Sequence, residues 1–243
     1  MNTLAKQIWQ RALWGQLNLF SLNFSAFIRR LYQVGNRSFW IVAGVTFFTG
    51  AALCQQAAYQ AMQLLGDQSI IGPEYIVLAF KSFGPLVVAL ALMSKVGAAF
   101  ASEIALMRQN QSLEALVLYK QDPGARWCAP MGLALTVGAI SLGLISTIIW
   151  ELAGMSVMYF LHGVLPKSFF RPDAVSGALV LLSCIKNAAF GQAIYWVSLR
   201  SGLFVGHGTT ATGFSTTQAM VRGVLLILMV NLVIDFFWLR VAS

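Results

Sequence analysis

The residues able to carry covalent chemistry are few and lie far apart in this 243-residue chain. Its two histidines, His162 and His207, and its eight acidic residues form neither an HExxH pair nor a nucleophile beside a base. Cys54, Cys128 and Cys184 stand in apolar surroundings without a CxxC or Cys/His cluster. The stretch GHGTTATG lacks the lysine of a phosphate loop. We therefore predict no catalytic residue, no metal site and no cofactor in this chain.

Polar side chains within apolar segments are the remaining candidates for a site. Gln55, Gln56 and Gln60 occur in CQQAAYQ, inside a segment without charge. An unpaired amide in hydrocarbon is costly, so these side chains should face protein, water or a lipid headgroup. Two interpretations stay open, namely the lining of a polar-tolerant cavity and hydrogen bonds between helices.

Lys81 and Lys186 are cations within apolar segments. Lys81 lies near the outer end of its segment and can extend its ammonium group to the membrane surface. Lys186 lies nearer the middle, where it could pair with an acid, a backbone carbonyl or an anionic lipid group. A functional and a structural role are both open for each lysine.

The composition shows which solvent these segments need. The chain is 58% hydrophobic and only 10% charged, with a mean hydropathy of +0.73, whereas soluble domains carry about 25% charged residues. The membrane is therefore the expected environment. The net charge of +8 fits the excess of Lys and Arg on cytoplasmic loops, and we expect no nucleic-acid partner.

Five apolar segments are long enough to cross a hydrocarbon core of about 30 Å. They cover residues 38–66, 74–100, 127–150, 174–199 and 217–239. Gly84-Pro85 should kink the second segment. Residues 151–173 are mixed in character and are predicted to be a connection outside the bilayer. The sequence thus predicts an all-α integral membrane protein in one domain, 1–243, with a five-span bundle over 37–240.

Residues 1–36 are predicted to form an amphipathic helix that lies in the membrane interface. The apolar residues that recur mostly every three to four positions are Leu4, Ile8, Trp9, Leu13, Leu17, Phe20, Phe24, Phe27 and Leu31. The alternative is an ordinary helix buried against the rest of the protein.

Basic residues predict the orientation. One side of the membrane would carry Lys6, Arg11, Arg29, Arg30, Arg37, Lys95, Arg108, Lys120, Arg126, Arg200 and Arg222. The opposite side would carry Lys167, Arg171 and Arg240. This bias predicts a cytoplasmic N-terminus and, with five spans, a C-terminus on the opposite side of the membrane.

A polar-rich stretch, SKVGAAFASEIALMRQNQSLEAL, follows the second span. Its apolar residues after residue 103 can share one helical face, while Glu103, Arg108, Gln111 and Glu114 supply exposed polar groups. Asp122-Pro123-Gly124 then breaks the helix. The stretch predicts a short cytoplasmic helix over residues 103–118, which could be gripped by another protein or could be a solvated connector.

An ordered set of motifs resembles the MlaE/YrbE-type permease of lipid-transporting ABC systems that work with MCE proteins. The motifs are RRLYQVG, FGPLVVALALMSKVGAAFASEIALMRQNQSLEAL, the Asp122-Pro123 pair, CIKNAAFG and STTQAMVRG, and they cover residues 29–240 in one register. The chain departs from the family pattern where Lys81-Ser82-Phe83 replaces Arg-Glu-Leu. It also has Asn231 in place of an expected Asp, with Asp235 one turn later.

The resemblance implies a homodimer in the bacterial inner membrane that moves phospholipids between the inner and outer membranes. It implies a separate ABC ATPase subunit that binds ATP, an MCE-domain hexamer on the periplasmic face and a small STAS-type accessory subunit. On this basis Gln55, Gln56, Tyr59, Lys81 and Ser82 are expected to line the lipid cavity. Glu103, Arg108, Gln111, Glu114 and Leu116 are expected to contact the ATPase through the cytoplasmic helix.

Two other functions are weaker alternatives. An ATP-independent secondary transporter of a lipophilic substrate would need an internal repeat and ion-binding acids near mid-membrane. In the sequence, Asp235 is the only acid inside a predicted span rather than at its first or last residue. A membrane lipid enzyme would need a catalytic cluster, which the sequence lacks.

Overall fold

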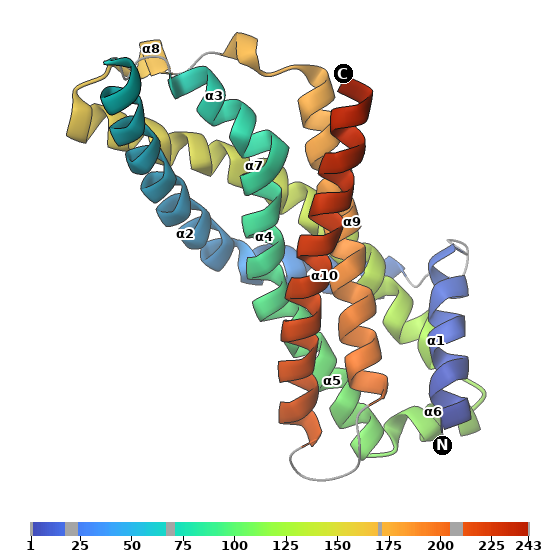
Figure 1. Cartoon of the computed structure of the whole chain (residues 1–243). Helices are drawn as coiled ribbons and strands as arrows, with labels where there is room; N and C mark the ends of the chain where they lie inside the picture. The colour runs from blue at the N-terminus through green and yellow to red at the C-terminus, as the bar shows by residue number, and fades with distance from the viewer. Residues whose placement is uncertain (1, 18–23, 67–70, 170–171, 205–210, 243) are drawn as a thin grey trace.

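The structure, a computed structural model, describes residues 2–17, 24–66, 71–169, 172–204 and 211–242. These residues form helices joined by short connections (Figure 1). In chain order they are α1 (Asn2–Leu17), α2 (Phe24–Leu65), α3 (Ile71–Leu78), the π-helix η2 (Ala79–Phe83), α4 (Gly84–Leu92), the π-helix η3 (Met93–Gly97), α5 (Ala98–Gln109), α6 (Ser112–Leu118), the π-helix η4 (Gly124–Cys128), α7 (Ala129–His162), α8 (Pro166–Phe169), the 3₁₀ turn η5 (Pro172–Ala174), α9 (Gly177–Leu203) and α10 (Ala211–Ala242).

Five stretches are long and apolar enough to cross a membrane, which confirms the predicted all-α membrane fold. They are Phe24–Leu64, Ile71–Gln109, Arg126–His162, Gly177–Leu203 and Thr212–Trp238. The second stretch is assembled from α3, η2, α4, η3 and α5, which follow one another without a loop. Its two π-helical turns are the places where the regular hydrogen-bond pattern changes.

The helices pack in an order that differs from their order in the chain. α2 lies along α7, α7 packs on α9, and α9 also contacts α10 and α5. Figure 1 shows α9 and α10 side by side, with α2 and the far part of α7 leaning away from them at the upper left. One buried core includes Phe100, Leu135 and Tyr195. A second core, built around Tyr75 and Trp150, fills the space between α2, α3 and α7.

The two ends of the bundle carry different elements. In Figure 1 the N-terminus, α1, α6 and the ends of α5 and α9 lie at the lower end. The C-terminus, α8 and the ends of α2 and α7 lie at the upper end. The polar stretch after the second span is therefore at the same end of the bundle as α1. We call these the α6 end and the α8 end below.

The N-terminal segment is two helices rather than one. α1 ends at Leu17, and the apolar residues from Phe24 onward belong to α2, which continues directly into the first span. The predicted boundary near residue 36 thus falls inside α2. Ile8 and Ala12 are buried, and α1 packs on η4 and α7. The apolar face of α1 therefore covers protein, as the alternative interpretation expected.

The predicted connection over residues 151–173 was wrong in its first half. α7 continues through Glu151 to His162, and Gly163 ends it in the left-handed conformation with a φ of 65°. Sequence reasoning took Glu151 as the end of the span because it carries a charge. Glu151 is only 5% exposed, so the helix buries this carboxyl group instead of ending there.

The predicted cytoplasmic helix over residues 103–118 is also divided. Residues up to Gln109 extend α5 and therefore the second span, while α6 is a separate short helix that begins at Ser112. Gln111 separates them with a φ of 56°, a backbone conformation that interrupts a right-handed helix. Leu113 is the buried residue that fixes α6 to the protein.

Candidate functional site

Lys186 lies at the centre of the most polar cluster within the spans. Its side chain on α9 is 0% exposed. The ammonium group donates hydrogen bonds to Asp235 Oδ1 at 2.5 Å, to Asn231 Oδ1 at 3.0 Å and to the Lys81 carbonyl oxygen at 2.6 Å. Three acceptors match the three protons of an ammonium group. The cluster therefore satisfies this cation inside the bundle, and it joins α9 to α10 and η2.

The Lys81 carbonyl is available because of Pro85. In a regular α-helix this carbonyl would accept from the backbone N–H of the residue four positions later, which here is Pro85 and has no N–H. The chain forms the π-helix η2 instead, in which the Gly84 N–H donates to the Ala79 carbonyl. The structure has a π-helical turn at the place where the sequence predicted a kink from Gly84-Pro85. The Lys81 carbonyl in this turn accepts a hydrogen bond from Lys186.

Gly84 is required where this turn meets α7. A Cβ atom at Gly84 would lie 2.3 Å from the Ala79 carbonyl oxygen and 3.2 Å from Thr147 Cγ2. Both separations are shorter than ordinary van der Waals contacts. A side chain at this position would therefore clash with the Ala79 carbonyl of η2 and would push η2 away from α7. The Gly-Pro pair therefore has two separate roles, which are close packing at Gly84 and an open acceptor at Lys81.

Asn231 and Asp235 act as one unit on α10. Residues four apart on an α-helix lie on the same face, so both side chains can reach the same partner on α9. The sequence showed Asn231 where the family pattern has Asp, with the acid one turn later. Both positions bind Lys186, so the cluster keeps one negative charge and its cation stays paired. Of the pairings left open for Lys186, the structure contains the acid and the backbone carbonyl.

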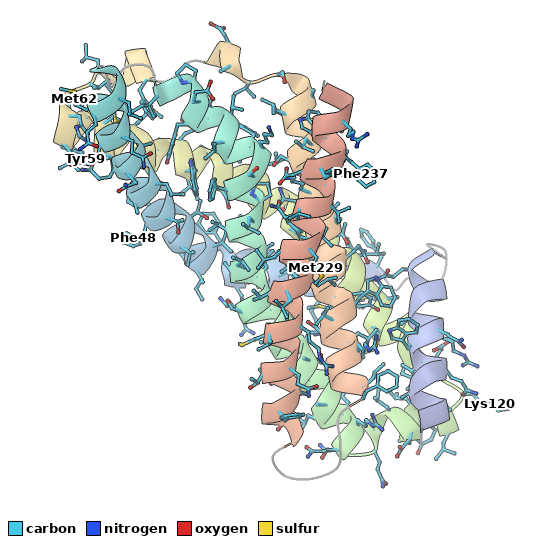
Figure 2. The ribbon with its side chains drawn as sticks, viewed as in Figure 1. Phe48, Tyr59, Met62, Lys120, Met229 and Phe237 are labelled. Atoms are coloured by element: carbon cyan, nitrogen blue, oxygen red, sulfur yellow. The ribbon has the colours of Figure 1, made fainter. Side chains whose placement is uncertain are left out.

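The residues expected to line a lipid cavity fall in two places. Gln55, Gln56 and Tyr59 lie on α2 near the α8 end, where all three are exposed. Figure 2 shows Tyr59 and Met62 on the part of α2 farthest from α10. Gln55 Oε1 lies 3.2 Å from His162 Nε2 on α7, a contact between helices. Gln56 and Tyr59 remain open to the surroundings.

Lys81 and Ser82 lie in η2, within the second span, and both side chains are half-buried. Lys81 contacts the Lys186 cluster through its backbone carbonyl and not through its ammonium group. The five cavity residues therefore do not meet in one pocket of a single chain. Their role as a lipid lining stays a prediction.

The α6 end carries a second charged cluster. Glu103 on α5 receives two hydrogen bonds from Arg30 on α2, at 2.6 and 2.9 Å, and one from Trp127 Nε1 at 3.2 Å. The Arg30 guanidinium also lies over the Trp127 ring, 5.2 Å from its centre. Such a two-point pair fixes both side chains, because the flat guanidinium matches the carboxylate. It fastens the first span to the end of the second.

A cavity of about 440 Å³ lies beside this pair, and Leu116 of α6 lines it together with Glu103, Arg29 and Arg126. Glu103 and Leu116 are the two predicted ATPase-contact residues that the structure brings to one cavity. Arg108 is half-buried at the end of α5, Gln111 is exposed at the break, and Glu114 lies in the first turn of α6. All five residues surround the corner between α5 and α6, and their contact with a partner stays a prediction.

Sequence reasoning missed three contributors. Arg30 was counted only as a cytoplasmic charge, although its place in RRLYQVG put it near the membrane. Asp235 was noted as a displaced acid within a span, but not as the partner of Lys186. Glu151 was assigned to a loop, but it adds a buried carboxyl to the third span, and neither of its oxygens has a partner among the described residues. The four-residue spacing of Asn231 and Asp235 was the one signal that could have indicated the Lys186 cluster.

Five apolar helical spans, a buried cation paired between them and a charged corner at one end define a multi-pass membrane protein. The sequence model of the family described as permease MlaE matches residues 27–237. The chain belongs to this family of ABC transporter permeases.

Curated relatives carry the same class of name. A "Probable ABC transporter permease protein" of Rickettsia felis is 31% identical over 225 residues, which is 90% of this chain and 85% of that protein. One from Rickettsia prowazekii is 30% identical over 227 residues, with the same coverage. The "Probable ABC transporter permease protein ycf63" of Porphyra purpurea is 26% identical over 213 residues, which is 86% of this chain and 80% of that protein.

Proposed function

We propose that this permease moves phospholipids between the inner and outer membranes of a bacterium, driven by ATP hydrolysis on a separate ABC ATPase subunit. The observation that carries the proposal is the corner between α5 and α6. α5 is continuous with the second span, and the Arg30–Glu103 pair ties α5 to the first span. A push on α6 would therefore move two spans at once, which is what a subunit without its own nucleotide site requires.

The further parts of the proposal follow from exposed surfaces. In its most apolar stretch α10 has only 11% of its residues buried, and the first span has 28%, against 56% in the second span. This free apolar surface is suited to a second copy of the chain, and we propose a homodimer with the lipid cavity between the copies. An MCE-domain hexamer would cover the α8 end, and a STAS-type subunit would bind the ATPase. The α6 end and the N-terminus would face the cytoplasm and the C-terminus the periplasm.

The test is reconstitution of the purified complex with labelled phospholipid in a donor membrane, following its arrival in an acceptor with and without ATP. Leu116→Asp and Glu114→Lys should each abolish ATP-dependent transfer while the protein still inserts and folds, because both change the surface that the ATPase would contact. Lys120→Gln is the matched control, since Figure 2 shows Lys120 pointing away from the bundle. Transfer that continues at the normal rate in both variants, or that needs no ATP, contradicts the proposal.

A further inference from the structure

A cavity of about 650 Å³ lies between α1, the end of α9 and the start of α10. Arg200 and Arg222 supply its charge, and the rings of Trp9, Phe204 and Phe214 form much of its wall. The Trp9 ring is held edge-on against Trp196, with 5.7 Å between the ring centres. The cavity therefore combines two cations with aromatic rings at the α6 end of the bundle.

A second cavity, of about 430 Å³, continues from the same two arginines. Val197, Leu225, Leu226 and Met229 line it, so it follows α9 and α10 away from the α6 end and into the apolar span. Met229 is two turns beyond Arg222 on α10, and Figure 2 shows it midway along that helix. The two cavities together make a groove that is cationic at one end and apolar along its length. We call it the Arg200–Arg222 groove.

The charge in this groove is not compensated. Neither Arg200 nor Arg222 has a hydrogen bond or ion pair with a described residue, and no acidic residue lines either cavity. Three acids of the chain are already paired with other cations, namely Glu103 with Arg30, Asp122 with Arg11 and Asp235 with Lys186. The segment 205–210 that joins α9 to α10 reads VGHGTT and contains no acid. An anion from outside the chain is therefore the natural partner.

We propose that the Arg200–Arg222 groove binds an anionic phospholipid of the leaflet that meets the α6 end, with its phosphate at the arginines and an acyl chain along α9 and α10. Basic pockets between membrane helices are suited to anionic headgroups, and aromatic rings favour the headgroup level. The groove begins at the α6 end, away from Gln55, Gln56 and Tyr59 near the α8 end, so the proposed headgroup site lies apart from these three expected cavity residues. The proposal concerns this lipid contact and does not require that the bound lipid is the one transported.

The groove should distinguish lipids by net charge. A phosphatidylglycerol head offers the arginines a phosphate with no opposing charge, whereas phosphatidylcholine carries its own cation beside the phosphate. A Lys or Arg near an anionic surface contributes about a fivefold gain in affinity, so two should give a preference of roughly 30-fold. A free phosphate compound would meet the same arginines but would leave the apolar cavity empty.

Native mass spectrometry of the intact complex, exposed to equal amounts of dioleoyl phosphatidylglycerol and dioleoyl phosphatidylcholine, measures this preference. Arg200→Gln/Arg222→Gln should lower it roughly 30-fold, toward equal binding. Arg37→Gln/Lys120→Gln removes two exposed cations outside both cavities and should leave it unchanged. Arg200→Lys/Arg222→Lys keeps the charge and should keep most of the preference, which separates lost binding from lost folding.

Two results would overturn the proposal. The first is an unchanged preference in Arg200→Gln/Arg222→Gln, or an equal loss in the control pair, since either shows that general surface charge retains the lipid. The second is displacement of the lipid by millimolar glycerol phosphate, which shows a site for a soluble anion rather than for a lipid. Retention of phosphatidylglycerol against glycerol phosphate, lost only in the glutamine pair, supports it.

Discussion

The Lys186 cluster gives the sharpest prediction, because one substitution leaves an acid without its partner inside the bundle. Lys186→Met keeps the length of the side chain but leaves Asp235, Asn231 and the Lys81 carbonyl without their donor. Breaking a buried ion pair costs about 3–5 kcal/mol. The Asp235 side chain is 25% exposed, so water can reach the carboxylate in part and the lower end of that range applies. In a chain of this size we expect Tm to fall by roughly 6–12 °C.

The double variant separates charge from packing. Lys186→Met/Asp235→Leu removes both charges and leaves the Lys81 carbonyl and Asn231 as the unpaired polar groups, at a cost of about 1–3 kcal/mol. Asp235→Leu alone leaves the lysine with neutral acceptors only and should be as damaging as Lys186→Met. The double variant should therefore be more stable than either single variant, which is the signature of a coupled pair.

The assay is thermal unfolding in one detergent at one scan rate, followed by tryptophan fluorescence, because unfolding of membrane proteins is commonly irreversible. Lys120→Met is the control, since it removes an exposed lysine and should leave Tm unchanged. If Lys186→Met also melts within about 2 °C of the parent, less than the shift expected from 1 kcal/mol, the pair does not hold the spans together. Additive losses in the double variant would equally refute the reasoning.

Two further substitutions test the packing and burial of the spans. Gly84→Ala should cost about 1–3 kcal/mol and lower Tm, because the added Cβ would lie 2.3 Å from the Ala79 carbonyl oxygen. The control Gly44→Ala has open space around its Cβ and should be neutral or slightly stabilising. Equal melting temperatures for the two variants would contradict the role given to Gly84. Glu151→Met should raise Tm by several degrees, because a buried carboxyl without a partner among the described residues costs about 1–3 kcal/mol. The control Glu74→Met changes an exposed position and should leave Tm unchanged. A lower Tm for Glu151→Met would show that the carboxylate has a stabilising partner.

The sequence was sufficient for the number of spans, because hydrocarbon demands long apolar stretches whatever the tertiary packing. It was insufficient where one polar residue had to be placed. Glu151 looked like the end of a span, since a charge normally stays at the membrane surface, but packing around α7 buries it. Gln111 ends a helical pattern through a backbone conformation that residue type does not specify. Periodicity alone thus continued the helix from Glu103 to Leu118.

The candidate sites show the same division. A kink at Gly84-Pro85 followed from the chemistry of proline, and a polar partner for Lys186 followed from the cost of a bare cation in hydrocarbon. Which partner it takes depends on the rotation of α9 and α10 about their axes. That rotation is fixed by packing across the whole bundle, beyond the reach of local spacing. The same holds for Arg30 and Glu103, which come from different spans.

Pro85 and Lys186 explain each other once the hydrogen bonds are counted. A proline in a membrane helix leaves one carbonyl without a donor, and this costs free energy unless another group supplies one. A lysine in the same layer needs acceptors, and a single acid satisfies only one of its three protons. Because the Lys81 carbonyl and the Lys186 ammonium group lie together at η2, each satisfies the other, and their hydrogen bond joins two separate spans. Any motion of the second span that displaces η2 must therefore break a hydrogen bond to Lys186 or carry α9 with it.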